Sequence, residues 1–572
     1  MCSYMSNFQY PDPRTTDPRQ HRLQRIFEII PGALTWFTLL GMFVFSFWVP
    51  LWVAVFIIAF DIYWLYRTIY ISIYSIAAFC KMRRWQEVNW MEACRKIADP
   101  ENFLREIEEE YQKAKKNFSE KRWKFFSEER KMAKKKLGAV GELKKEIQEI
   151  LKRDKSKFLP WEDIFHVIML PTAGEGPEII EPAIQAVADS NYPNEKFIIL
   201  LATEEREDKE KREYKVNYLK NKFGKTFFDF LVTVHRVAPG EMKAKASNTT
   251  FAAKELKKYL ESKNIPLKRV ILSNFDCDTC AHPQYFAALS LKYCTEPRRL
   301  HFAYQPLPMY HNNIWDTNAF VRIIVTGSSF WHMVESMRPE HMVTFSSHSE
   351  PFQTIVDVNY WPVNVISEDS LVFWKGYTFF NGDYEVKPIY LPVSLDAVLA
   401  NTYWKTIVNQ YKQKRRWAYG IENFPLLARA FLKNKKIPFR KKLRHLFVML
   451  EGHWSWATNS FIIALLGWLP VIIGGPEFNR SVLAHNLPYI TRYLMNAALV
   501  GLVVSMFLSL MLLPPRPKKY SRKKYIYMFL QWFLVPITAP FLGALPAVDS
   551  QTRIMLGKYF GEFWVTEKIR KK

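Results

Sequence analysis

Four long apolar segments constrain this 572-residue chain more strongly than any other feature of its sequence. They cover residues 33–48, 51–80, 456–473 and about 487–513. Their lengths are near the roughly 20 apolar residues that a helix needs to cross a bilayer. Tyr, Trp and Phe crowd the ends of the first two segments, and basic residues flank this pair on both sides. Because such flanks stay in the cytoplasm, the sequence predicts a multi-pass protein of the cell (plasma or inner) membrane.

The excess of basic residues points to a lipid surface. The chain carries 80 Lys and Arg against 55 Asp and Glu, a formal net charge of +25. Such a chain could bind nucleic acid or lie against anionic lipid. No nucleic-acid motif accompanies the charge, so we expect the bilayer as a partner and no nucleic acid. Cys277-x-x-Cys280 invites a zinc or redox interpretation, but zinc would need a second ligand pair, and none occurs at a suitable spacing.

The middle of the chain has the pattern of an α/β domain. Residues 85–162 are rich in Glu, Lys and Arg with apolar residues at helical spacing, which predicts a charged helical linker. From residue 163 onward, short runs rich in Ile, Val and Phe alternate with helical stretches, which predicts a mostly parallel sheet covered on both faces. The runs lie at 164–170, 197–202, 227–235, 270–275 and 300–305, and the helical stretches at 178–189, 205–222 and 245–262.

Two acidic residues stand at the end of one predicted strand. Asp276 and Asp278 directly follow the apolar run that ends at Phe275. Ligands of open α/β sheets bind at this edge, and two carboxylates suit a Mg²⁺ or Mn²⁺ ion that bridges a diphosphate. On their own, two solvated acids at a strand end explain the pair equally well. Neither a Walker pattern nor G-x-G-x-x-G occurs, so a diphosphate would have to be held by a metal ion and by cationic side chains.

Three further stretches have a plain structural interpretation when each is taken alone. Ser367-Glu368-Asp369 could be a helix N-cap, and Gln413-x-x-Arg416-Trp417 could anchor the chain at the membrane surface. Lys243 and Asn248 follow the third predicted strand. In this order, and with Asp276-x-Asp278, the stretches resemble the motifs of family 2 glycosyltransferases. The resemblance is to the membrane-embedded branch of cellulose, chitin and hyaluronan synthases, and it spans about residues 164–417 and the flanking helices.

The resemblance implies a GT-A-like cytoplasmic domain inserted between transmembrane helices, and an inverting transfer from a nucleotide-diphosphate sugar. Asp369 would be the base that deprotonates the acceptor hydroxyl, and a divalent ion on the Asp-x-Asp pair would neutralise the leaving diphosphate. The implied site residues are, for the metal, Asp278 and Asp276; for the nucleotide sugar, Asp276, Lys243, Asn248, Glu204 and Arg416; and for the acceptor, Gln413, Trp417 and Glu368.

The donor and the product stay open at this point. The family usually places an Asp after the second strand, where this chain has Glu204 and Glu205, so the base contact is undefined, although a uridine diphosphate sugar is favoured. A processive polysaccharide synthase with export is the first interpretation. Transfer to a lipid-linked acceptor and a non-catalytic scaffold or transporter that binds nucleotide sugar are the alternatives, and accessory subunits are undefined.

The chain is thereby divided into seven parts. Residues 525–545 are apolar but are interrupted by Pro536, Pro540 and Gly543, so we expect this segment to enter the membrane and return, or to lie in the interface, with a plain fifth crossing as the alternative. The parts are a cytoplasmic arm (1–32), two transmembrane helices (33–84), the charged linker (85–162), the GT-A-like domain (163–400), the Gln-x-x-Arg-Trp segment with amphipathic interface helices (401–452), two transmembrane helices (453–513), and a basic loop, membrane segment and basic tail (514–572).

Overall fold

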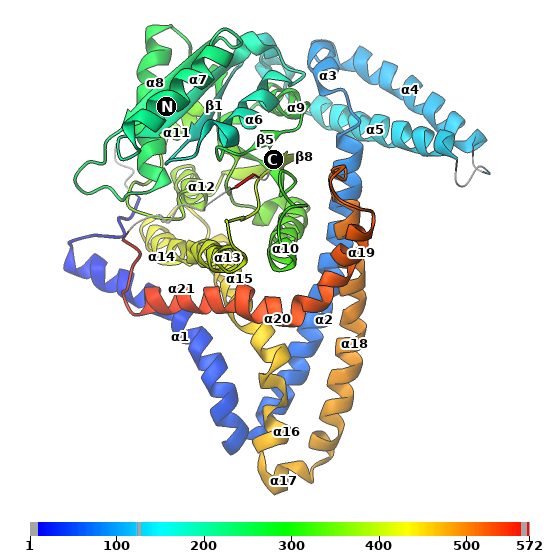
Figure 1. Cartoon of the computed structure of the whole chain (residues 1–572), viewed down its shortest axis with the longest axis vertical. Coiled ribbons are helices and arrows are strands. Elements are labelled where there is room, and N and C mark those ends of the chain that lie inside the picture. Colours follow the sequence, from blue (N-terminus) through cyan, green and yellow to red (C-terminus); the bar gives the residue numbers. More distant parts are fainter. Residues whose placement is uncertain (1–9, 122, 124–126, 562–568, 571–572) are drawn as a thin grey trace.

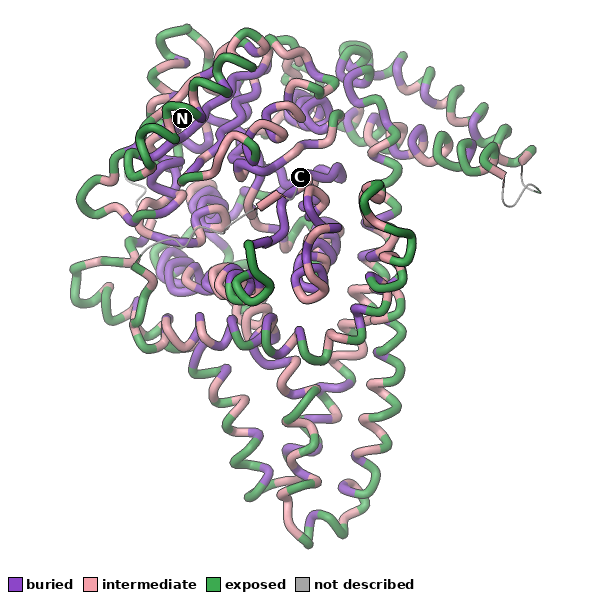
Figure 2. The backbone as a smooth tube through the Cα atoms, viewed as in Figure 1, coloured by how far each residue is buried: buried purple, intermediate pink, exposed green. Residues whose placement is uncertain are grey.

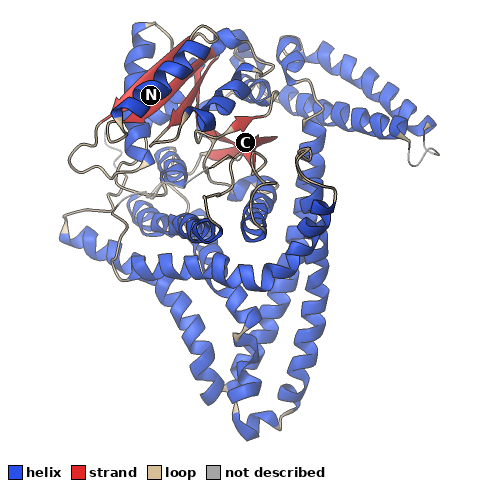
Figure 3. Ribbon diagram, in the orientation of Figure 1, coloured by secondary structure: helices blue, strands red, loops and turns tan. Residues whose placement is uncertain are grey.

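A computed structural model of the chain describes residues 10–121, 123, 127–561 and 569–570. It has three regions: an α/β domain, a set of long apolar helices on one side of it, and a two-helix arm that projects sideways (Figure 1). Strands occur in the α/β domain and not among the long helices (Figure 3). The predicted architecture, an α/β domain with a mostly parallel sheet inserted between apolar helices, is confirmed.

The sheet has eight strands in the order β3-β2-β1-β4-β7-β6-β8-β5. Strands β1 to β4 pair in parallel, β7 is antiparallel to both of its neighbours, β6 and β8 are parallel, and β5 is antiparallel to β8. The sequence indicated five of these strands and missed β5, β7 and β8. Their bounds are β1 Phe165–Pro171, β2 Phe197–Glu204, β3 Asp229–His235, β4 Val270–Asn274, β5 Cys280–Ala281, β6 Phe302–Met309, β7 His348–Pro351 and β8 Glu385–Ser394.

The central strands are buried on both faces because their apolar side chains alternate between two cores. In β1, Ile168 and Leu170 belong to one cluster, and Val167 and Met169 belong to the other. This is the period of two that a strand imposes, and each fully buried side chain of this size contributes about 1.5–3 kcal/mol. The covering helices include α6 Pro177–Ala188, α7 Lys209–Phe223, α8 Lys245–Ser262, α9 Tyr285–Cys294, α10 Ala319–Ser336, α11 Phe352–Asp357 and α12 Glu368–Phe379.

The predicted charged linker contains the projecting arm. The arm is an antiparallel hairpin of α4 Pro100–Glu120 and α5 Glu128–Leu151, and α3 Trp90–Lys96 lies at its base (Figure 1). Ion pairs such as Lys136–Glu110 and Lys144–Glu108, both at 3.1 Å, cross the hairpin. Exposed pairs of this kind contribute little, so the apolar seam around Phe103, Ile107 and Ile147 holds the two helices together.

Four helices are long and apolar enough to cross a membrane among the residues that the structure describes. They are α1 Pro18–Trp48, α2 Pro50–Trp85, α18 Val482–Met511 and the broken segment Lys523–Met555. A fifth candidate is the pair α15 Phe439–Ala464 and Leu466–Ile473, which is bent by 54°. The sequence divided this region into an interface helix and a separate crossing, but the structure has one continuous helix from Phe439 to Ala464, which passes through Gly452 without a break.

The last apolar segment is broken where the prolines and Gly543 stand. It comprises α19 Lys523–Leu530, a 3-10 turn, α20 Val535–Thr538, a π-helical stretch Ala539–Ala544 and α21 Leu545–Met555. In Figure 1, α20 and α21 run across the bundle instead of along α18. Beyond α21, Phe560 packs against Tyr419, two residues after Trp417, with ring centroids 4.5 Å apart. Phe563 and Trp564 of the basic tail lie outside the described residues.

Candidate active site

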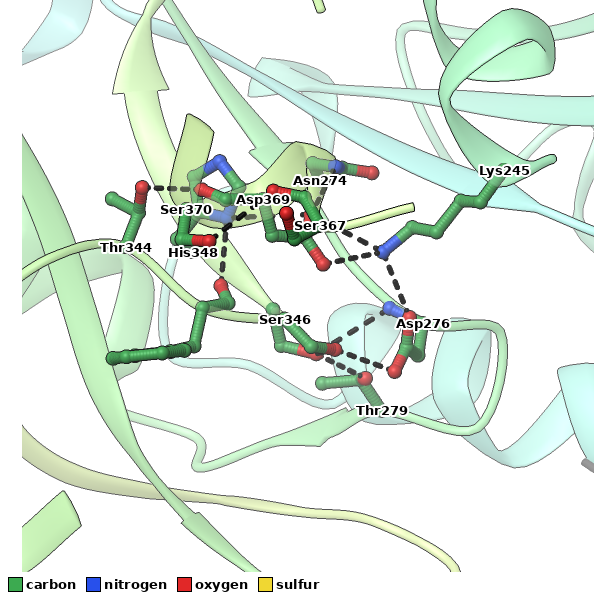
Figure 4. Close-up of polar contacts among 12 residues, drawn as sticks. Lys245, Asn274, Asp276, Thr279, Thr344, Ser346, His348, Ser367, Asp369 and Ser370 are labelled. Carbon is green, nitrogen blue, oxygen red and sulfur yellow. Dashed lines mark hydrogen bonds and ion pairs between the residues drawn. The ribbon is translucent and has the colours of Figure 1, made fainter. Parts of the chain in front are cut away.

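The candidate site lies where β4 ends and two helices begin. Asn274 is the last residue of β4, and Asp276 and Asp278 follow it in the turn before β5. Lys245 is the first residue of α8, and Asp369 lies in the first turn of α12. The sheet topology places the end of β4 near these helix starts, because β4 is a central strand with β1 on one side and β7 on the other. Figure 4 shows the side chains of Lys245, Asp276 and Asp369 converging on one point.

Lys245 bridges the two acids. Its Nζ lies 2.9 Å from Oδ1 of Asp276 and 3.2 Å from Oδ2 of Asp369. Burial alone would lower the pKa of Lys245, but the two carboxylates outweigh burial and raise it. Lys245 was not among the sequence candidates. The sequence analysis chose Lys243 from its spacing to Asn248, and Lys243 is exposed on the turn that leads into α8.

Asp369 is held from several sides. Asn274 Nδ2 donates to its Oδ1 at 3.1 Å, His348 Nδ1 lies 3.9 Å from the same oxygen, and the Thr344 hydroxyl donates to its carbonyl. Ser367 occupies the N-cap position of α12, but its hydroxyl donates to Glu422 at 2.7 Å and does not cap the helix. Ser367 therefore stands at the N-cap position without capping α12. The carboxylate of Asp369, in the first turn, faces Lys245.

Asp276 is fixed by the loop before β7. Its Oδ2 accepts a hydrogen bond from Ser346, and its backbone N–H donates to Ser347 Oγ at 3.4 Å. Ser347 has a φ of 64°, in the left-handed region that a serine rarely adopts, and its hydroxyl also bonds to Thr279 at 2.7 Å. Backbone strain of this kind is typical of functional sites.

Asp278 is completely buried beside Asp276. Its Oδ2 accepts the backbone N–H of Asp396 at 2.7 Å. The Asp396 carboxylate in turn pairs with Arg570 of the tail at 2.9 and 3.1 Å. No group of three or more His, Cys, Asp or Glu gathers as a metal centre within the described part of the chain. A Mg²⁺ ion is usually held by one or two carboxylates and substrate phosphates, so the Asp276 and Asp278 pair fits an ion that binds together with a diphosphate.

Helix α13 Tyr403–Ala418 carries the Gln-x-x-Arg-Trp residues. Burial lowers the pKa of Arg416, and the nearby carboxylates of Asp276 and Glu368 act in the opposite direction. Burial also raises the pKa of Glu368 to about 8, and Asp369 adds to this rise. Gln413 is buried, and Trp417 packs against Tyr310 with ring centroids 6.4 Å apart.

The remaining sequence candidates make local contacts. Asn248 is buried and donates to the carbonyl oxygen of Ala202 at 2.9 Å, which ties α8 to the end of β2. Glu204 ends β2, pairs with Arg206, and has a pKa that burial raises. Both contacts lie at the end of β2. Cys277 and Cys280 do not form a disulfide with each other.

Comparisons with known proteins place this geometry in context. No family model matches the chain. It is 27% identical over 179 residues to a poly-β-1,6-N-acetyl-D-glucosamine synthase of Staphylococcus epidermidis, and 26% identical over 179 residues to the same synthase of a second strain. The chain is similar to a family 2 glycosyltransferase in sequence as well as in motif order. Each match covers 31% of this chain and 38% of the relative.

Some solved structures have a weak likeness to the chain. A mannosyltransferase from Pyrobaculum calidifontis with GDP-mannose and Mn²⁺ covers 62% of this chain and 92% of its own, with 14% identity and a TM-score of 0.37. The S. aureus TarS fragment 1–349 with UDP-GlcNAc covers 69% of this chain and 93% of its own, with 10% identity and a TM-score of 0.34.

Proposed function

We propose that this chain is an inverting membrane glycosyltransferase that transfers a sugar from a nucleotide-diphosphate donor to a growing polysaccharide. The observation that carries the proposal is the bridge that Lys245 makes between Asp276 and Asp369. Asp276, at the end of a strand, would face the donor, and Asp369, at the start of a helix, would face the acceptor. Both then share the ammonium of Lys245. A binding-only protein has no need for the second acid, so the arrangement favours catalysis over a scaffold or transporter.

The roles follow from chemistry. Asp369 takes the proton of the acceptor hydroxyl, which must attack opposite the leaving diphosphate for inversion. Arg416 binds diphosphate oxygens, because its guanidinium can donate two parallel hydrogen bonds. Lys245 offsets the repulsion between the two acids until the donor's negative charge arrives and competes for the ammonium. A Mg²⁺ or Mn²⁺ ion held by Asp278 and Asp276 would act as a Lewis acid on the diphosphate.

The acceptor side is assigned to α13 and α12. Trp417 offers an apolar ring face to a sugar, while Gln413 and Glu368 offer hydrogen-bonding groups. The relative of known product makes an N-acetylglucosamine polymer, so a uridine diphosphate N-acetylglucosamine donor is the first to test. Transfer of a single sugar to a lipid-linked acceptor is the second candidate.

We further propose that the apolar helices cross the cell membrane several times with the α/β domain in the cytoplasm. The basic loop at residues 514–524 and the basic flanks of α1 and α2 support this orientation. Arg570 reaches Asp396 in the α/β domain, which supports a tail on the same side. Labelling of a single cysteine at Lys572 with a membrane-impermeant reagent in intact cells would place the tail outside and overturn this orientation.

The transferase proposal is tested with purified full-length protein and a panel of radiolabelled nucleotide sugars. We expect one donor to yield a polymer that depends on divalent metal and on Asp369. A product with one added sugar on lipid favours the second candidate. Binding of a donor without any transfer would reject catalysis.

A further inference from the structure

Strand β7 places a buried histidine and a buried glutamate behind the proposed base. His348 and Glu350 are two residues apart, so their side chains lie on the same face of the sheet. Ser349, between them, faces the other side, where its hydroxyl bonds to Ser273 at 2.7 Å. The side chains of His348 and Glu350 are only 1% and 2% exposed. Because both are buried (Figure 2), they can act on a bound substrate only through a neighbouring residue.

His348 lies beside Asp369. It is the cross-strand partner of Asn274 in the β4–β7 pair, so these two side chains are neighbours. Asn274 Nδ2 donates to Asp369 Oδ1 at 3.1 Å, and His348 Nδ1 lies 3.9 Å from the same oxygen (Figure 4). The other oxygen, Oδ2, lies 3.2 Å from the Lys245 ammonium. Two neighbouring strands therefore support one oxygen of the proposed base.

The hydrogen bond that His348 makes to the backbone defines its tautomer. Its Nδ1 lies 2.8 Å from the carbonyl oxygen of Phe345. A carbonyl oxygen only accepts, so Nδ1 carries a proton, and in the neutral ring Nε2 is left as an acceptor. The Nδ1–H edge of the ring is thus the edge nearer to Asp369, and a polarised N–H at this place favours the carboxylate form of that acid.

Glu350 stands at the other edge of the ring. Its Oε1 lies 3.7 Å from His348 Nε2, and both atoms are buried without a hydrogen-bond partner among the described residues. A protonated carboxyl group supplies the donor that Nε2 lacks. A movement of about 0.5–1 Å brings the two atoms to hydrogen-bond distance. Hydrogen bonds of active sites are often long before substrate binds, and they tighten in the complex.

The charge balance agrees with a proton on Glu350 and a neutral ring. Burial raises the pKa of Glu350 to about 8, while Tyr384 opposes this rise and Asp369 adds to it. Burial lowers the pKa of His348, and Asp369 acts in the opposite direction. A neutral acid beside a neutral imidazole also avoids the cost of burying two charges.

We propose that His348 and Glu350 are positioning residues for Asp369, joined by a hydrogen bond from the Glu350 carboxyl group to His348 Nε2. This bond fixes the imidazole with its Nδ1–H edge towards Asp369, and so orients the carboxylate that takes the proton of the acceptor hydroxyl. The proton of Glu350 stays within the pair, since the acceptor proton goes to Asp369. The inference rests on the proposed transferase function and on Asp369 as its base.

The first test compares His348→Asn with His166→Asn in the full-length protein. Asparagine keeps a donor for the Phe345 carbonyl but has no atom at the Nε2 position. His166 is the matched control, because it is also fully buried in the sheet but lies beside the start of β4. We expect His348→Asn to lower kcat roughly 10- to 100-fold, with the affinity for a non-transferable donor analogue nearly unchanged. His166→Asn should leave kcat near wild type.

Three results of this comparison would overturn the proposal. The first is wild-type kcat in His348→Asn. The second is an equal loss of kcat in both variants, because any buried histidine of the sheet would then have the same effect. The third is a loss of donor-analogue affinity as large as the loss of kcat, because the whole site would then be disturbed.

Glu350 supplies the second test, measured at neutral pH. Glu350→Gln keeps a donor for Nε2, whereas Glu350→Leu removes the donor at a similar volume. We expect kcat near wild type in Glu350→Gln and, in Glu350→Leu, a loss of the same size as in His348→Asn. The double variant of His348→Asn and Glu350→Leu should lose no more than either single variant, because both break one connection. Multiplied losses, or equal kcat in the Gln and Leu variants, would contradict the bond.

The two proposals fail in distinguishable ways. A wild-type protein that transfers no sugar from any donor rejects the transferase proposal, and this inference with it. Transfer that depends on Asp369 but on neither His348 nor Glu350 rejects this inference alone.

Discussion

Removal of the Lys245 ammonium is the sharpest test of the candidate site. The substitution is Lys245→Met, which keeps the length of the side chain and removes its charge. The nitrogen lies 2.9 Å from Asp276 and 3.2 Å from Asp369. At an effective dielectric constant of about 20, each attraction is roughly 5–6 kcal/mol before the cost of desolvation. The Lys245 side chain is only 11% exposed, so the substitution leaves two carboxylates without their shared partner.

The net effect is smaller than the gross attraction. Removing one partner of a buried pair costs about 3–5 kcal/mol, and the Asp276 side chain is one-third exposed, so water recovers part of that cost. We expect a loss of at least about 2 kcal/mol, or roughly 30-fold in kcat/KM, since about 1.4 kcal/mol is tenfold. Binding of a non-transferable donor analogue should weaken with it, because the two acids would face the diphosphate uncompensated.

Lys243→Met is the matched control for this experiment. It removes the same charge two residues earlier, from the exposed lysine that sequence spacing favours. Transfer from a radiolabelled donor and analogue binding are measured for both variants. A smaller loss in Lys245→Met than in Lys243→Met would refute the structural assignment. Wild-type kinetics in Lys245→Met would reject the bridge as a functional feature.

The other predictions concern the base, the metal, the acceptor and pH. Asp369→Asn should lower turnover about 10²–10⁴-fold with donor-analogue affinity nearly unchanged, and turnover close to wild type would exclude Asp369 as the base. Chelation or Asp278→Ala should abolish transfer, and activity in excess chelator would contradict the metal role. Trp417→Ala should shorten the polymer more than it weakens donor binding, as seen by sizing the product. Burial raises the pKa of Glu350 in the folded protein to about 8, above its ordinary pKa of about 4.3. The contribution of Glu350 to the free energy of unfolding is therefore fully present below about pH 4.3 and is lost as pH rises towards 8. Glu350→Gln should therefore raise the melting temperature at about pH 8 and not at about pH 4, and equal effects at both would contradict the buried acid.

The fold could be predicted where the chain repeats a simple period. Strands β1, β2 and β4 are apolar runs buried on both faces, and the predicted helix at 245–262 has the bounds of α8. Strand β7 escaped because its sequence, His348–Pro351, is short and polar. Strand β8 escaped because it contains Pro388 and Pro392, which ordinarily argue against an interior strand. Its register against β6 shifts between Gln305 and Leu307, which accommodates the irregularity.

The candidate site could be predicted only for residues that stand in recognisable motifs. Asp276, Asp369 and Arg416 are brought close together as the motif order implies. Lys245 could not be chosen over Lys243, because both precede Asn248 and only the start of α8 decides which side chain points at the acids. His348 and Asp396 lie on or beside strands that the sequence did not reveal, so their approach to Asp369 and Asp278 had no local signal.

The packing of α13 links the candidate site to the apolar helices. Arg415 of α13 pairs with Asp549 of α21 at 3.0 Å, and the Ser550 hydroxyl donates to the Arg415 carbonyl at 2.7 Å. Gln551, the next residue of α21, accepts a hydrogen bond from Thr35 of α1 at 2.7 Å. One turn of α21 thus connects the helix that carries Arg416 to the first apolar helix. Because Arg416 directly follows Arg415, its position depends on this connection. An isolated α/β domain would therefore lose the support of the cation that we propose binds the diphosphate.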